Sequence, residues 1–170
     1  MGSIGKKVAI RANSFGLNVL YHNRNKLDKD LEKKLSANYV DLVSLLRQSK
    51  YVVLLTPLSK ETKHLINRRT LAMMRKDAYI INMARGKIIK EADLVLALEN
   101  NIIAGAGLDV FEFEPKVNKK LMNMNNVVLM PHAGSATYKT RMGMMDLACR
   151  NIVNYLVYNK YDNLVNREIL

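Results

Sequence analysis

The sequence predicts an α/β fold, in which a doubly wound parallel β-sheet carries helices on its faces. Short runs of β-branched and aliphatic residues alternate along the chain with segments of helical periodicity, as in strand–helix–strand units. The strongest run, YVVLL over residues 51–55, is apolar throughout, as expected of a buried parallel strand. Polar residues follow several of these runs, and the carboxyl ends of parallel strands are where such folds bind ligands.

Each element is expected from its own local pattern. The expected strands are residues 18–21, 51–55, 78–81, 102–110 and 127–130. The expected helices are residues 1–13, which open with GSIG, then 27–35, a segment capped by Asp41 and running to about residue 48, 91–98, and 137–158. A further helix is expected to be capped by Asn67 and to carry Leu71, Met73 and Met74. Asp and Asn are favoured caps because their side chains accept hydrogen bonds from the first free N–H groups of a helix.

Length and composition indicate one soluble domain over residues 1–170, long enough to have its own hydrophobic core. No apolar run approaches the ~20 residues needed to cross a bilayer, and the N-terminus lacks the apolar segment of a signal peptide. One cysteine, Cys149, excludes an internal disulfide and fits a reducing compartment, so we expect a cytoplasmic protein without a membrane partner.

The last long helix, over residues 137–158 and ending by residue 160, carries apolar side chains that predict burial against another surface. These side chains are Met142, Met145, Leu147, Ile152 and Leu156. Cys149 lies in the same helix and is interpreted as a small core residue.

The formal net charge of +12 is compatible with nucleic-acid binding. However, the basic residues are scattered, form no long block and are not accompanied by an aromatic-rich stripe. We therefore expect no nucleic-acid partner. A basic surface also favours an anionic ligand, such as a phosphorylated cofactor or a carboxylate substrate.

Gly2, Ser3, Ile4 and Gly5 have the spacing of the second half of a G-x-G-x-x-G loop that opens a helix. Such a loop lets backbone N–H groups approach a pyrophosphate at the helix N-terminus. The first glycine and the preceding strand do not occur in this sequence. A chance pair of glycines is therefore the alternative interpretation.

The position that selects the cofactor follows such a loop by roughly 20 residues. An acid there accepts from the ribose 2′-hydroxyl of NAD, whereas a nearby arginine accommodates the 2′-phosphate of NADP. This chain has Asn23, Arg24 and Asn25, with Lys26 next and no acid before Asp28. The pattern favours NADP, with NAD possible; a solvated turn is the alternative.

Charged residues follow three of the expected strands. Asp109 and Glu114 lie at and just past the end of the strand in GAGLDVFEFEP, Arg85 follows INMA with Gly86 behind it, and His132 follows the last strand. Each alone has an ordinary interpretation: a loop carboxylate, an ion pair, a capping histidine. Together, at one edge of a parallel sheet, they predict an acid/base site.

Four segments, TPLSKETKHLIN, INMARG, AGAGLDVFEFEP and PHAGSAT, stand in this order along essentially the whole chain. In order and spacing they resemble the NAD(P)-binding half of the D-isomer-specific 2-hydroxyacid dehydrogenases. LYHNR and LDVFEFEPK are most similar to the fungal glyoxylate/hydroxypyruvate reductase branch. The resemblance implies a Rossmann-type domain, a homodimer, and NADP-dependent reduction of a small 2-keto acid to the D-2-hydroxy acid.

The resemblance also implies a role for each site residue. Arg85 would bind the carboxylate of the keto acid, His132 would protonate its carbonyl oxygen, and Glu114 would hydrogen-bond His132 and raise its pKa. Asp109 would hold the nicotinamide carboxamide. The remaining cofactor contacts would come from Gly2, Ser3, Ile4 and Gly5 at the pyrophosphate, Asn23, Arg24 and Asn25 at the adenosine, and Met83, Ala84 and Gly134 through the backbone. No metal ligand is implied.

The sequence departs from the family pattern at its beginning. The substrate domain and the first strand of the nucleotide-binding fold are absent from it, and in the order 3-2-1-4-5-6 that strand is central. Strand edges left without a partner would cost ~1–3 kcal/mol per unpaired buried group. A catalytically inactive nucleotide-binding remnant, or a regulatory module of the same family, is therefore the alternative function.

Overall fold

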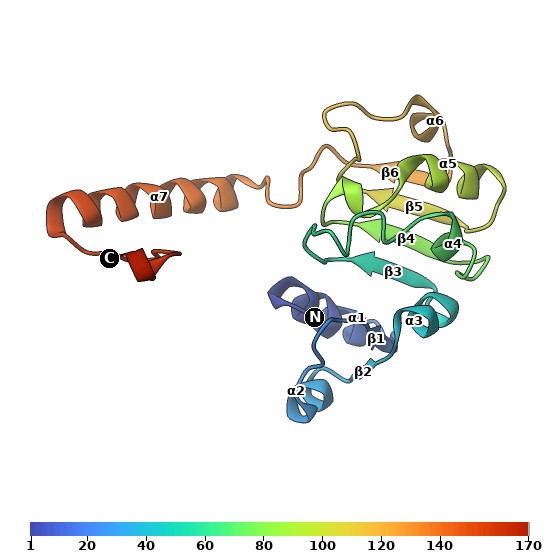
Figure 1. Ribbon diagram of the computed structural model, residues 1–170, viewed down its shortest axis with the longest axis horizontal. Coiled ribbons are helices and arrows are strands. Elements are labelled where there is room, and N and C mark those ends of the chain that lie inside the picture. The colour runs from blue at the N-terminus through green and yellow to red at the C-terminus, as the bar shows by residue number, and fades with distance from the viewer. Residues whose placement is uncertain (170) are drawn as a thin grey trace. The chain divides into compact units, whose positions relative to one another are not determined.

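The computed structural model describes residues 1–169. The chain forms two compact units, Met1–Pro131 and a second unit that begins at His132, and each is described by itself (Figure 1).

The first unit alternates helices and strands, which confirms the expected α/β class. Its elements are α1 (Ser3–Ser14), β1 (Val19–Tyr21), α2 (Lys29–Lys34), β2 (Ala37–Tyr39), α3 (Leu42–Gln48), β3 (Tyr51–Leu54), α4 (Arg68–Leu71), β4 (Tyr79–Asn82), the 3₁₀ helix η1 (Gly86–Ile88), α5 (Glu91–Glu99), β5 (Gly105–Leu108), α6 (Lys119–Met122) and β6 (Val127–Leu129).

In residues 1–169 the strands form two parallel sheets, in the orders β1-β2 and β3-β4-β5-β6. The break between β1 and β3 falls where the order 3-2-1-4-5-6 places its first strand. All strand pairs are parallel, and the register sets Asn82 opposite Leu108 at the carboxyl ends of β4 and β5. The loops that leave these two neighbouring strands therefore start side by side.

The main core lies between the larger sheet and helices α3, α4 and α5. Leu46, Leu71, Ile80 and Leu94 are fully or almost fully buried in it. Along β3 and β4 buried residues alternate with exposed or half-buried ones. The apolar run that contains β3 is therefore buried on one face only. On the open face the rings of Tyr51 and Tyr79 stack on each other with centroids 5.9 Å apart.

A smaller cluster joins β1, β2 and α2. Tyr21, Leu35 and Ala37 are buried in it. The Tyr21 hydroxyl donates to the Glu32 carboxylate at 2.6 Å and accepts from the Leu27 N–H at 2.9 Å. Burial, followed by the hydrogen bond to Glu32, raises the pKa of the Tyr21 hydroxyl. This cluster fixes the segment that leaves the end of β1.

Both predicted caps are confirmed. The Asp41 side chain accepts from the Ser44 N–H at 2.9 Å at the start of α3, and the Asn67 side chain forms a capping box with Thr70 at the start of α4. However, α4 ends at Leu71, because the N–H groups of Met73 and Met74 bond to carbonyls three residues back, those of Thr70 and Leu71, in a tight turn. Met73 and Met74, which were expected in this helix, lie beyond it.

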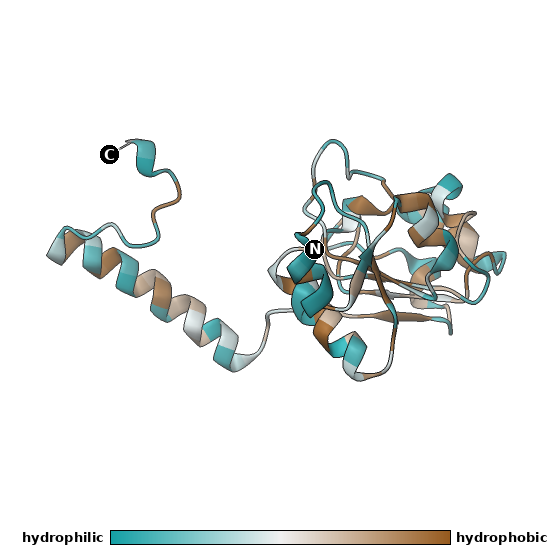
Figure 2. Cartoon of the chain, turned by 90° about the horizontal axis from the view of Figure 1, so that it is seen from below, coloured by the Kyte–Doolittle hydropathy of each residue, from teal (hydrophilic) through white to brown (hydrophobic). Residues whose placement is uncertain are grey.

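The second unit contains α7 (Tyr138–Tyr158), which Thr137 caps by accepting from the Thr140 N–H at 3.2 Å, and the short η2 (Arg167–Ile169). The apolar side chains predicted to be buried, Met142, Met145, Leu147, Ile152 and Leu156, are exposed, and apolar bands run along α7 in Figure 2. Cys149 is exposed as well, so its interpretation as a core residue is wrong. Hydrophobicity predicts that a side chain is buried but does not show whether the residues that bury it belong to the same chain.

Across residues 1–169, no helix combines the length and the apolar character needed to cross a membrane.

Candidate active site

The loop that carries Arg85 is fixed by the last residue of β4. Asn82 is 1 % exposed. Its Oδ1 accepts from the Ala84 N–H at 3.1 Å and its Nδ2 donates to the Arg85 carbonyl at 3.0 Å. An amide can make both bonds at once, and an aliphatic residue would leave both backbone groups unsatisfied. The sequence pattern assigned no role to Asn82.

Gly86 allows this loop to lie against the loop after β5. A Cβ atom at Gly86 would come within 1.8 Å of the Phe111 carbonyl oxygen and 2.5 Å of the Glu112 nitrogen. Only a glycine lets the two backbones approach this closely. The backbones of the Arg85 and Glu114 loops are therefore in direct contact.

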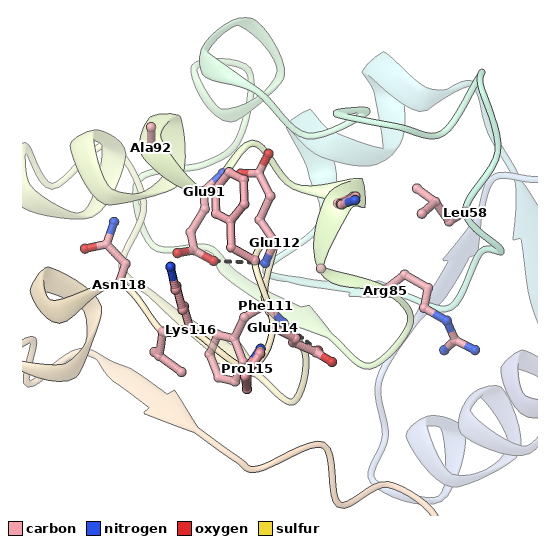
Figure 3. Close-up of a pocket in the computed structure, with 14 residues that line it drawn as sticks. Leu58, Arg85, Glu91, Ala92, Phe111, Glu112, Glu114, Pro115, Lys116 and Asn118 are labelled. Atoms are coloured by element: carbon pink, nitrogen blue, oxygen red, sulfur yellow. Dashed lines mark hydrogen bonds between the residues drawn. The ribbon is translucent and has the colours of Figure 1, made fainter.

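Arg85 and Glu114 line one hollow of about 860 Å³, together with Leu58, Lys87 and Lys116 (Figure 3). The exposed Arg85 guanidinium donates through Nη1 to the Ala84 carbonyl at 2.7 Å. Glu114 Oε1 accepts from the Phe111 N–H at 3.0 Å. A guanidinium and a carboxylate thus share one concave surface at the ends of β4 and β5.

Asp109 directly follows β5, as predicted, and is 4 % exposed. Its N–H donates to the Asn82 carbonyl at 3.0 Å, which ties the ends of β4 and β5 together. In the β4 loop Met83 is exposed and Ala84 is buried. These three residues therefore occupy the same sheet edge as Arg85.

The N-terminus of α1 suits the pyrophosphate of a dinucleotide. Gly2 is its N-cap, with no side-chain cap bond and no acid in the first turn. A Cβ at Gly2 would meet nothing within 4 Å, whereas one at Gly5 would meet Met1 Sδ at 3.2 Å. Free N–H groups and the positive end of a 12-residue helix attract an anion. Residues 2–5 fit this part of the cofactor.

Asn23, Arg24 and Asn25 follow β1 after one intervening residue, and Arg24 and Asn25 are exposed. The Asn23 side chain donates to the Asn25 carbonyl at 3.1 Å, which fixes the turn. Lys26 lies 4.4 Å from the centroid of the Tyr39 ring. Two cations beside an exposed turn can receive an added phosphate.

His132 and Gly134 belong to the second unit. His132 has a φ of +54°, in the left-handed region that non-glycine residues rarely adopt. The partnership of His132 and Gly134 with the residues of the first unit stays a prediction.

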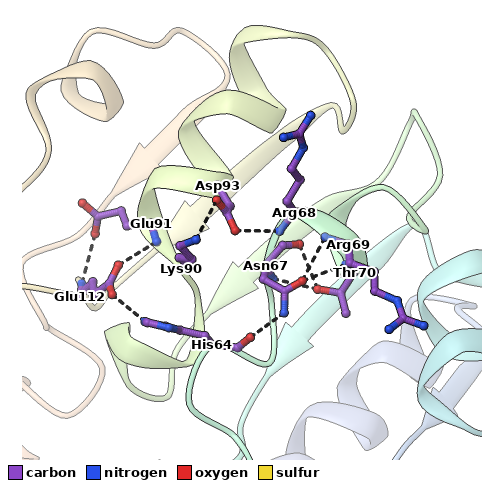
Figure 4. A network of polar contacts seen from close by, with 9 residues as sticks. All are labelled: His64, Asn67, Arg68, Arg69, Thr70, Lys90, Glu91, Asp93 and Glu112. Atoms are coloured by element: carbon purple, nitrogen blue, oxygen red, sulfur yellow. Dashed lines mark hydrogen bonds and ion pairs between the residues drawn. The ribbon is translucent and has the colours of Figure 1, made fainter.

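A further polar network, which the sequence reasoning missed, lies beside the Glu114 loop (Figure 4). Glu112 Oε1 lies 2.7 Å from His64 Nε2, and Glu112 Oε2 accepts from the Glu91 N–H at 2.8 Å. In return, Glu91 Oε2 accepts from the Glu112 N–H at 3.1 Å. Glu112 and Glu91 are 9 % and 6 % exposed. In the sequence, the only feature that points to this network is Glu112, an acid two residues before Glu114.

Burial raises the pKa of the Glu91 carboxyl, and the charge of Glu112 raises it further. The stability that such a group contributes is complete below its unfolded value of 4.5 and is lost as the pH rises through its folded pKa. We therefore expect Glu91→Gln to raise the free energy of unfolding at neutral pH by up to about 1 kcal/mol. The glutamine keeps an acceptor for the Glu112 N–H but carries no charge.

Urea unfolding at neutral pH and at a pH below 4.5 measures this effect. The gain should disappear at the lower pH, where Glu91 is protonated in both states. An equal gain at both pH values would contradict the assignment to the charge of Glu91.

Comparisons with known proteins agree with this geometry. The family description "D-isomer specific 2-hydroxyacid dehydrogenase, NAD binding domain" matches residues 1–134. A glyoxylate reductase of Thermococcus onnurineus is 46 % identical over 169 residues, which cover 99 % of this chain and 50 % of that protein. One from Pyrococcus horikoshii is 45 % identical over 170 residues, covering 100 % and 51 %.

Solved structures give the same result. A glyoxylate reductase from Paecilomyes thermophila superposes with a TM-score of 0.88 at 41 % identity, covering 99 % of this chain and 51 % of that one. An NADPH-dependent glyoxylate/hydroxypyruvate reductase from Sinorhizobium meliloti, in complex with NADP and malonate, gives 0.87 at 34 % identity, covering 95 % and 49 %.

This chain spans about half the length of the curated relatives it matches. The match over residues 1–134 and the parallel α/β fold lead to one conclusion. The chain belongs to the D-isomer specific 2-hydroxyacid dehydrogenase family and carries its NAD binding domain.

Proposed function

We propose that this chain is the cofactor-binding and catalytic half of an NADP-dependent enzyme that reduces glyoxylate or hydroxypyruvate to the D-2-hydroxy acid. The observation that carries the proposal is the shared hollow of Arg85 and Glu114 at the ends of β4 and β5. The relatives named glyoxylate reductase support the choice of substrate.

In this proposal the Arg85 guanidinium forms a forked pair of hydrogen bonds with the substrate carboxylate. The His132 imidazolium donates a proton to the carbonyl oxygen as that oxygen gains negative charge. Glu114 accepts a hydrogen bond from His132 and stabilises its charged form. NADPH, when bound, supplies the hydride.

Residues 2–5 would hold the pyrophosphate through backbone N–H groups, and Asn23, Arg24 and Asn25 would hold the adenosine end. Asp109 would accept from the nicotinamide carboxamide, while Met83, Ala84 and Gly134 would line the cofactor through their backbones. The exposed Arg24, with no acid before Asp28, favours NADP because an acid would repel the 2′-phosphate.

The test is a titration of the chain with NADPH, followed by absorbance of the reduced nicotinamide with and without glyoxylate. Binding together with glyoxylate-dependent oxidation supports the proposal. Binding without oxidation supports the nucleotide-binding remnant. A chain that binds neither NADPH nor NADH would overturn both the enzyme and the nucleotide-binding remnant.

The cofactor preference has its own test. Arg24→Glu is expected to weaken NADPH binding by about 10- to 100-fold, since a charged hydrogen bond is lost and a repulsion is added. Binding of NADH should change by less than about threefold. Lys29→Glu, an exposed charge reversal in α2, is the control for net charge. Equal losses for NADPH and NADH would contradict a 2′-phosphate contact.

We also propose that the protein is a homodimer and that the exposed apolar side chains of α7 pack on a substrate domain. Sedimentation of the chain tests whether it is a dimer. Co-expression of the chain with the substrate domain of a relative measures the second statement, through lowered proteolysis of α7.

A further inference from the structure

We propose that His64, acting through Glu112, is a positioning residue that holds the Glu114 loop in its working geometry. This inference deepens the proposed function and rests on it for the role of Glu114. Neither His64 nor Glu112 is required to touch substrate or cofactor. Their effect would pass through the peptide units of Phe111 and Glu112.

The first step of the argument is that the Glu112 carboxylate joins three segments. Oε1 meets His64 Nε2 at 2.7 Å, in the connection between β3 and α4. Oε2 accepts from the Glu91 N–H at 2.8 Å, at the start of α5. Residues 64 and 112 are 48 positions apart in the sequence. The Glu112 side chain is 9 % exposed and the contact with the Glu91 N–H is buried, away from competing water. The His64 side chain is 32 % exposed, so its contact with Glu112 is only partly shielded.

The second step is that His64 itself is held in an uncommon conformation. Its φ is +53°, in the left-handed region that residues with a Cβ rarely adopt. Its N–H donates to the Lys87 carbonyl at 2.9 Å, and its carbonyl accepts from Asn67 Nδ2 at 2.8 Å. These bonds hold the imidazole toward Glu112. A histidine whose ring only faced solvent would not need this backbone conformation.

The third step is that the held peptide units lead directly to Glu114. The Glu112 N–H donates to Glu91 Oε2 at 3.1 Å, and the next N–H back, that of Phe111, donates to Glu114 Oε1 at 3.0 Å. The Gly86 backbone lies against the same two residues. A shift of Glu112 therefore moves the donor that fixes the Glu114 carboxylate.

The rival explanation is that Glu112 only completes the N-terminus of α5. The N-cap of this helix is Lys90, with no side-chain cap bond, so the carboxylate does take the place of a cap. That role alone predicts a loss of stability. It does not predict a selective change at Phe111 or in turnover.

The experiment compares Glu112→Ala, Glu112→Gln and His64→Ala with the unchanged chain. Glutamine keeps one oxygen for the Glu91 N–H and turns an amide N–H₂ toward His64. Glu99→Ala is the control, because Glu99 is an exposed acid of α5 with one ion pair, to Lys120 at 2.9 Å. The first readout is amide hydrogen exchange at Phe111, compared with Ile80 in the core of β4.

We expect Glu112→Ala to speed exchange at Phe111 by about 10- to 100-fold beyond any change at Ile80, the range for losing a buried charged hydrogen bond. His64→Ala should give a smaller increase, and Glu112→Gln should restore most of the protection. Turnover of glyoxylate should show kcat about tenfold lower in Glu112→Ala, with the KM for NADPH unchanged.

Phe111 exchange that follows Ile80 in every variant would overturn the inference and leave only the capping role. A failure of NADPH binding in the unchanged chain would instead overturn the proposed function. The exchange measurement needs no turnover, so the two failures can be told apart.

Discussion

Gly86→Ala is expected to lower the free energy of unfolding by at least about 3 kcal/mol, a large share of the ~5–15 kcal/mol that a domain has. The added Cβ would lie 1.8 Å from the Phe111 oxygen and 1.9 Å from its carbonyl carbon. These are backbone atoms and have no alternative rotamer. The loops after β4 and β5 must separate, which strains the hydrogen bond from Asp109 N–H to the Asn82 carbonyl. Urea unfolding followed by circular dichroism measures the loss.

Gly107→Ala is the matched control. A Cβ at Gly107 would meet only the Ile81 side chain, at 3.7 Å, an ordinary contact. The free energy of unfolding of Gly107→Ala should stay within about 1 kcal/mol of that of the unchanged chain, because alanine also loses less backbone entropy on folding than glycine. A Gly86→Ala chain that fails to fold beside a folded Gly107→Ala chain supports the close approach. Equal stability of both variants would contradict it.

Arg85→Ala is expected to lower kcat/KM for glyoxylate by about a thousandfold, while the Kd for NADPH changes by less than about threefold. Alanine removes the whole forked contact with the substrate carboxylate. Arg85→Lys keeps the charge but cannot fork, so we expect a loss of about 10- to 100-fold. Initial rates of NADPH oxidation over a range of glyoxylate concentrations measure both.

Lys87→Ala is the control for Arg85. Lys87 is another exposed cation that lines the same hollow, two residues along the chain. It should lose no more than about threefold in kcat/KM, the effect of a screened surface charge. A loss in Lys87→Ala that equals that of Arg85→Ala would mean that the hollow attracts anions only through its net charge.

Local patterns predicted most elements but missed β2, which depends on strand pairing, and the short helices η1 and α6. Residues 37–39 have a polar residue between Ala37 and Tyr39 and were assigned no strand, yet they form β2 because β1 lies beside them. The strand expected over residues 102–110 is shorter in the structure and starts at Gly105. Ile103 lies before that strand and is completely buried. An apolar run shows that residues need burial but does not give their backbone conformation.

The sequence by itself determined the α/β class, the family, and the position of Arg85 and Glu114 just past two strand ends. The class and the two positions follow from short-range pattern, because the solvent exposure of neighbouring positions fixes the period of hydrophobic residues. The family follows from the resemblance of four sequence segments, in order and spacing. Only the tertiary structure showed the contact of Gly86 with Phe111 and the joining of His64 to Glu112 and Glu91. These contacts connect residues 21 to 48 positions apart. They depend on how β4, β5 and α5 dock, and no local pattern encodes that docking.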